Sequence, residues 1–207
     1  MTANLHPGLN LGESHGAAHP ASENRVFGFW VFLMSDLITF GILFATYAAS
    51  GTPMGLAGGP GPAQLFDLTS VALQTAFLLA SSLTCGMASL SMKAHAGAGR
   101  IALWLLVTAL LGGGFLMLEL SDFASMLAQG AGPARSGWLS GFFALVGLHG
   151  LHITAGLLWI GVLLGLLAVQ GLSDRVKTRL LLFALYWHFL DLVWIGIFSI
   201  VFLRGLA

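Results

Sequence analysis

The chain has 207 residues, of which 57% are hydrophobic and only 8% are charged, and its mean hydropathy is +0.90. A soluble domain normally carries about 25% charged residues, so this composition argues against a soluble domain and indicates an integral membrane protein. Eight basic and eight acidic residues leave no net charge, and nothing in the composition favours nucleic-acid binding. The single cysteine, Cys85, lies inside an apolar segment and is expected to act as a small apolar side chain.

Residues 1–24 are polar and lack helical or strand periodicity, so we expect them to form a flexible tail. The following domain, residues 25–207, holds five apolar runs, each long enough for the ~20 residues that cross a bilayer. The sequence therefore predicts an all-α integral membrane protein, a bundle of five transmembrane helices joined by short loops. The predicted helices span residues 26–49, 67–92, 100–128, 138–169 and 177–203.

Local signals predict how these helices begin and how closely they pack. Asp67 or Thr69 can cap the second helix, and the glycine triplet at 112–114 allows another helix to approach closely. The short loops predict that consecutive helices are antiparallel neighbours. Small residues four apart in the fourth helix also suit close helix contacts. They are Gly137 with Gly141, and Gly161 with Gly165.

The basic residues at the helix ends predict an orientation. Two basic residues, Arg135 and Arg204, stand on the side of the bundle that holds the C-terminus, whereas six stand on the opposite side. These six are Arg25, Lys93, Arg100, Arg175, Lys177 and Arg179. Because cytoplasmic loops carry the excess of Lys and Arg, we expect a cytoplasmic N-terminus and an external C-terminus.

Seven ionisable residues lie within the predicted spans rather than at their ends. They are Asp36, Glu119, Asp122, His149, His152, His188 and Asp191. Each acid costs about 2.5–3.5 kcal/mol to insert, so these residues must be paired, protonated or in contact with water. We therefore expect them to face the interior as a buried polar cluster.

Three uses compete for this cluster. A metal site would use a Glu and a His three residues apart on one helix, repeated on a second helix. Here the pair with that spacing in the fourth helix consists of two histidines, His149 and His152. Haem ligation by two histidines would have to pair His188 with one of these two, because two histidines on one helix face cannot clamp one haem. The third use is a structural cluster that locks the helices together and shares a proton, and we favour it.

The sharpest expectation concerns Asp36. It lies at mid-membrane depth in the first helix, and no Lys or Arg occurs in any span at that level. Its only available cationic partners are histidines, of which His152 is the first choice because it lies nearest the middle of the fourth helix. We predict a contact of ~2.6–3.2 Å between these two side chains, which would let the pair share one proton.

Four motifs carry a resemblance to a known family. They are residues 35–36 (SD) with 44–47 (FATY), 121–123 (SDF), 147–152 (GLHGLH) and 186–194 (YWHFLDLVW). These motifs resemble subunit III of the haem–copper terminal oxidases, and the likeness runs from about residue 26 to the end. Within that family, residues 27–36 (FGFWVFLMSD) and 135–147 (RSGWLSGFFALVG) look most like the bo-type ubiquinol oxidases.

The resemblance implies a non-catalytic subunit of a proton-pumping ubiquinol oxidase in the bacterial inner membrane, with the N-terminus cytoplasmic and the C-terminus periplasmic. This subunit packs beside and stabilises subunit I, which holds the haems and copper and is expected to take the ubiquinol. Subunits II and IV belong to the same complex, and no cofactor or metal is expected in this chain. Asp36 stands where many members of the family have Glu, and the first two helices of seven-helix members are missing.

Two other functions stay open at this point. One is subunit III of a menaquinol or cytochrome c oxidase, because only the resemblance of the motifs indicates which electron donor the oxidase uses. The other is a stand-alone membrane redox enzyme that binds its own metal or haem. An optical spectrum and a metal analysis of the isolated chain would separate that class from a non-catalytic subunit.

Overall fold

The computed structural model describes residues 18–94 and 97–206, and within them the fold is all-α, without a strand. Five segments are long and apolar enough to cross a membrane, each between 26 and 34 residues. They lie in α1 (Ala18–Ser50), α4 (Leu68–Lys93), α5 (Ala98–Ala128), α6 (Gly137–Gln170) and α7 (Asp174–Ile197), the last continued by the π-helical η2 (Phe198–Leu203) and the short α8 (Arg204–Leu206). The predicted bundle of five membrane-spanning helices is confirmed.

The helix bounds differ from the prediction mainly at the N-terminus. α1 begins at Ala18, so residues 18–24 are helical although they were expected to belong to an irregular tail. The rest of that predicted tail, residues 1–17, lies outside the described residues. Once a helix has formed, each added residue gains one more backbone hydrogen bond, and the helix can therefore extend beyond its apolar stretch.

Side-chain caps fix where two of the long helices start. The Asp67 carboxylate accepts a hydrogen bond from the backbone N–H of Thr69 at 2.9 Å, so Asp67 is the cap of α4. The hydroxyl of Ser136 accepts from the N–H of Leu139 at 3.2 Å at the start of α6. Both caps satisfy N–H groups that the first helical turn leaves without a backbone partner.

The loops at the end of the bundle where the C-terminus lies contain short helical pieces. They are α2 (Pro53–Leu56), α3 (Pro62–Leu65) and the 3₁₀ turn η1 (Pro133–Arg135). Each begins with proline, whose fixed φ suits the first position of a helix. α2 packs on α6 and α3 packs on α8, so the connection from α1 to α4 crosses the end of the bundle.

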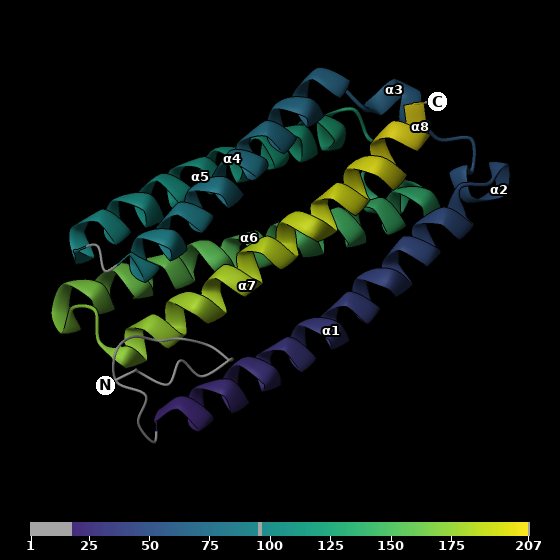
Figure 1. Cartoon of the computed structure of the whole chain (residues 1–207). Helices are drawn as coiled ribbons and strands as arrows, with labels where there is room; N and C mark the ends of the chain where they lie inside the picture. Colours follow the sequence, from purple (N-terminus) through teal and green to yellow (C-terminus); the bar gives the residue numbers. More distant parts are fainter. Residues whose placement is uncertain (1–17, 95–96, 207) are drawn as a thin grey trace, which may run out of the picture.

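The five long helices are not arranged in simple chain order (Figure 1). α4 and α5 form one antiparallel pair, which packs against the pair α6 and α7. α1 lies on the other side of α6 and α7, so the expectation that it neighbours α4 is wrong. The crossing segment with α2 and α3 is long enough to separate the two helices. α7 consequently contacts α1, α4 and α6.

α1 touches the bundle along a narrow seam. Within residues 24–50, its buried side chains are Leu33, Phe40 and Tyr47, which are seven residues apart and therefore stack on one side of the helix after every two turns. Phe27 and Ile38, by contrast, are each 67% exposed. Most of the surface of α1 is thus open to lipid or to another protein.

Trp187 of α7 packs directly against the backbones of α5 and α6. A Cβ atom at Gly112 would lie 2.8 Å from its ring, and one at Gly156 would lie 2.6 Å from it. The indole N–H donates to the hydroxyl of Ser81 on α4 at 3.0 Å, so this one side chain contacts three neighbouring helices. Only glycine fits at these two positions without moving a buried ring.

These contacts test the predicted close approaches. The triplet at 112–114 does admit neighbours, since Phe77 also lies 3.2 Å from a Cβ built at Gly114. Gly141 contacts the backbone of Tyr47 on α1, as expected for a close helix contact. A Cβ at Gly161 or Gly165 would meet no other part of the described chain within 4 Å, so for these two the prediction of a close contact inside the bundle is wrong.

Gly156→Ala should lower the stability of the bundle, whereas Gly161→Ala on the same helix should not. Both changes raise helix propensity by roughly 0.5–1 kcal/mol, but only the first drives a methyl group into the Trp187 ring. Overpacking of this kind costs about 1–3 kcal/mol. Thermal unfolding in detergent measures the difference, and equal midpoints for the two variants would contradict the packing described here.

Candidate functional site

The predicted contact between Asp36 and His152 is present, and it joins α1 to α6. The Nε2 atom of His152 lies 3.2 Å from Oδ2 of Asp36, and the two side chains are 19% and 15% exposed. Oδ2 accepts no well-aligned hydrogen bond from the described residues, so this is a contact at ion-pair distance rather than an ideal hydrogen bond. Phe40 and Tyr186 place their rings beside the imidazole.

The other nitrogen of His152 determines what this contact requires. Nδ1 lies 2.8 Å from the carbonyl oxygen of Leu148, which can only accept, so Nδ1 carries a hydrogen. A neutral imidazole would then turn the lone pair of Nε2 toward a carboxylate, which is repulsive. One additional proton, on Nε2 or on Asp36, removes that repulsion.

His149 does not join this pair. Its side chain is fully buried beside the rings of Phe115 and Trp194, which also contact each other, and its Nε2 lies 3.2 Å from the carbonyl oxygen of Leu190 on α7. Its Nδ1 has no hydrogen-bond partner among the described residues. Although one helical turn separates His149 from His152, the two imidazoles serve different neighbours, α7 and α1.

A second polar contact joins α4 to α7 near the surface of the bundle. The Nδ1 atom of His188 lies 2.8 Å from the hydroxyl of Ser82, and His188 as a whole residue is exposed. Asp191, three residues further along α7, is close enough to interact electrostatically with His188, and its buried Oδ1 lacks a hydrogen-bond partner in the described part of the chain. This places an exposed imidazole at mid-membrane depth.

The two acids of α5 have contrasting surroundings. Asp122 accepts hydrogen bonds from two residues of α4, from Ser70 at 2.9 Å and from Gln74 at 2.6 Å. Glu119 is 2% exposed, and no described residue forms a hydrogen bond with either of its carboxyl oxygens. It lies against Gly150 of α6, where a Cβ would come within 2.7 Å of Oε2. Glycine at 150 thus makes room for this carboxyl group.

The seven predicted residues therefore do not form one cluster. They are distributed over separate contacts that join α1 to α6, α4 to α7, α4 to α5 and α6 to α7. Within residues 18–94 and 97–206, three or more His, Cys, Asp or Glu side chains nowhere come together as a metal-binding group. What this arrangement can do chemically is tie neighbouring helices together through side-chain and carbonyl contacts.

The sequence interpretation missed the partners on α4. Ser70, Gln74 and Ser82 hold Asp122 and His188, and Thr75 accepts the indole N–H of Trp194 at 3.0 Å. A signal was available, because this span has a mean hydropathy of 1.5 compared with 2.3 for α5. A hydroxyl-rich span is the natural place to look for the partners of acids and histidines on neighbouring helices.

Comparison with known proteins decides the family. Residues 11–206 match the family model described as cytochrome c oxidase subunit III. The chain belongs to this family. It is 47% identical to cytochrome bo(3) ubiquinol oxidase subunit 3 of Pseudomonas aeruginosa, over 94% of this chain and 92% of that protein.

Two relatives from Bacillus subtilis bear on the electron donor. The chain is 40% identical to quinol oxidase subunit 3, over 88% of each chain. It is also 40% identical to cytochrome c oxidase subunit 3, over 89% of this chain and 88% of that protein. The resemblance found in the sequence motifs is thus confirmed, and subunit III relatives come from both quinol and cytochrome c oxidases.

Asp36→Asn should cost little stability, whereas Asp36→Leu should cost about 1–3 kcal/mol, because leucine leaves the Nε2 atom of His152 without a polar partner. The asparagine amide can still donate to that nitrogen. Unfolding in detergent gives the stability, and ¹⁵N NMR of the imidazole reports its protonation state. A double-mutant cycle with His152→Phe supplies the control. A coupling energy near zero would show that the two side chains do not interact.

Proposed function

We propose that this chain is the non-catalytic subunit III of a proton-pumping bo-type ubiquinol oxidase of the aerobic respiratory chain. In this proposal it packs beside the haem–copper subunit I and stabilises it, and subunits II and IV complete the complex. The observation that carries the proposal is the 47% identity, over almost the whole chain, to a protein named as that subunit. The haems, the copper and the ubiquinol site are expected in subunit I.

The surroundings of the polar side chains support a structural role for this chain. The carboxyls and imidazoles of Asp122, His149 and His188 are engaged by side chains or carbonyl groups of neighbouring helices. A group in such a contact is held in place rather than presented to a substrate. We accordingly expect no catalytic residue and no cofactor in this chain.

Exposed features of the bundle support a protein partner. His188 is exposed at mid-depth, where hydrocarbon offers its free nitrogen no hydrogen bond. In the apolar 18-residue stretch of α1, only 11% of the residues are buried within this chain, compared with 56% in the corresponding stretch of α7. A neighbouring transmembrane subunit would cover both the polar group and the thinly packed helix.

A second candidate is subunit III of a cytochrome c oxidase, which the 40% identity to the Bacillus subtilis protein of that name favours. The identity is higher for the ubiquinol oxidase relative, at 47%, so ubiquinol is the preferred donor. Oxygen uptake by the purified complex, measured with ubiquinol, menaquinol and reduced cytochrome c in turn, distinguishes the donors. Faster turnover with cytochrome c than with either quinol would replace the first candidate by the second.

The proposed site of action is the bacterial inner membrane, with the N-terminus in the cytoplasm and the C-terminus in the periplasm. A periplasm-active alkaline phosphatase fused after Ala207 should be active, and the same reporter fused after Lys93 should be inactive. The reason is that six basic residues stand at the helix ends assigned to the cytoplasm, whereas only two stand at the opposite ends. A cytoplasm-active reporter at the same two positions serves as the control. The reverse pattern of activity would mean that the orientation is inverted.

Deletion of this chain should lower the yield and the stability of the oxidase without changing the haem spectrum per large subunit. The reason is that a subunit without cofactors contributes packing alone. The reduced-minus-oxidised spectrum, normalised to the amount of large subunit, is the measurement, and expression of the full chain from a plasmid is the control. Loss of the haem signal with a normal amount of large subunit would favour a cofactor in this chain, which metal analysis of the isolated chain would then identify.

A further inference from the structure

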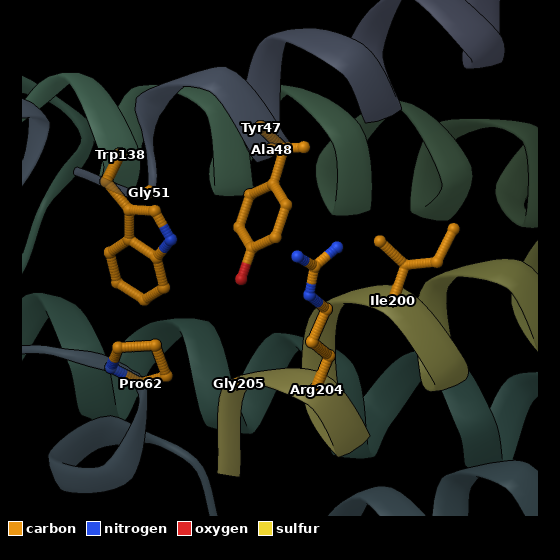
Figure 2. Close-up of a pocket in the computed structure, with 8 residues that line it drawn as sticks. All are labelled: Tyr47, Ala48, Gly51, Pro62, Trp138, Ile200, Arg204 and Gly205. Atoms are coloured by element: carbon orange, nitrogen blue, oxygen red, sulfur yellow. The ribbon is translucent and has the colours of Figure 1, made fainter. Parts of the chain in front are cut away.

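A cavity of about 240 Å³ opens at the end of the bundle where α1 ends, α6 begins and α8 follows η2. Its volume is far larger than a single water needs. Figure 2 shows that the Tyr47 hydroxyl and the Arg204 guanidinium point into the same space, while Trp138 and Pro62 close its other side. Four segments distant in sequence thus build one pocket: the end of α1, Pro62 of α3, the start of α6 and the C-terminal turns.

The polar groups of this pocket suit an anion. Arg204 is exposed and forms no hydrogen bond or ion pair with any described residue, and no acidic residue lines the pocket. The hydroxyl of Tyr47 lies 3.5 Å from the Val201 carbonyl, at the limit of a hydrogen bond, and its oxygen also accepts from the indole N–H of Trp138. The phenol proton can therefore turn toward a ligand. A guanidinium presents paired N–H donors that match the oxygen atoms of a carboxylate or phosphate.

The position of the pocket and its apolar lining restrict the class of ligand further. The last membrane span ends at Leu203, directly before Arg204, and α1 ends at Ser50. The pocket therefore lies at the level where a bilayer changes from hydrocarbon to headgroups, where Tyr and Trp are enriched. Ala48 and Ile200 add an apolar wall next to the charged groups. A ligand that fills this pocket has an anionic group and an apolar part.

We propose that this pocket binds a phospholipid, with its phosphate on Arg204 and Tyr47 and the start of an acyl chain against Ala48 and Ile200. The guanidinium donates to the two free phosphate oxygens, the phenol donates to one of the same two oxygens, and Trp138 lies at the headgroup level. The site is formed by α1, α3, α6 and the C-terminal turns of this one chain. It does not depend on which electron donor the oxidase uses.

Binding of dihexanoyl phosphatidylglycerol to the purified, delipidated oxidase complex tests this proposal by native mass spectrometry and calorimetry. Arg204→Gln should weaken binding about tenfold or more, because a charge-assisted hydrogen bond contributes more than one of ordinary strength. Arg204→Lys keeps the charge without the paired donors, so its affinity for the lipid should lie between that of the unchanged protein and that of Arg204→Gln. Tyr47→Phe, which keeps the ring packing, should give a smaller loss. Arg135→Gln, at the same end of the bundle but outside the pocket, should bind as the unchanged protein does.

Two further probes separate the sources of the phosphate. Dihexanoylglycerol, which lacks the phosphate, should bind weakly and equally to the unchanged complex and to Arg204→Gln. Inorganic phosphate alone should bind much more weakly than the lipid. Equal affinity for inorganic phosphate and lipid would show a phosphate site rather than a lipid site, and would overturn the proposal. So would unchanged lipid binding in Arg204→Gln, or a complex in which Arg204 pairs with an acid of another subunit.

Discussion

Hydrocarbon offers no hydrogen bonds, so each polar side chain inside a membrane bundle needs a partner on another helix. That constraint accounts for the contacts of most ionisable residues in this chain, whereas the carboxyl oxygens of Glu119 have no hydrogen-bond partner among the described residues. Asp122 is held from α4, His188 is joined to α4, His149 to the backbone of α7, and Asp36 to His152. Together these contacts involve all five long helices. Each is worth only about 0.6–1.7 kcal/mol, yet a helix that slid along its neighbour would lose its contact entirely.

Polar contacts fix the register of the helices, while their spacing is set by close packing of rings against glycine. Trp187 combines both, because its ring occupies the space left by Gly112 and Gly156 and its N–H binds Ser81. The same principle applies to Glu119, which lies where Gly150 leaves room for it. α7 contacts α1, α4 and α6, so a change in its packing reaches most of the bundle.

The sequence was sufficient for features that depend on one segment at a time. Span number and the cap of α4 follow from local patterns, and Asp36 was matched to His152 because depth and charge left few other partners. Features that depend on how segments pack were less accessible. The position of α1 away from α4 depends on the path of the 51–67 connection, which loop length alone does not reveal. The expected single cluster failed because backbone carbonyls and the hydroxyls of α4 proved to be partners, and an approach based on charged residues overlooks such groups.

The seam of Leu33, Phe40 and Tyr47 has a consequence for biosynthesis. The chain leaves the ribosome from its N-terminus, so α1 enters the membrane first, while α6 and α7, the helices against which it packs, are made last. During that interval α1 has no native neighbour, and Asp36 is without His152. The first helix to be synthesised is therefore the one that waits longest for its first native helix neighbour, and a membrane insertase or another oxidase subunit has its best opportunity to hold α1 during this delay.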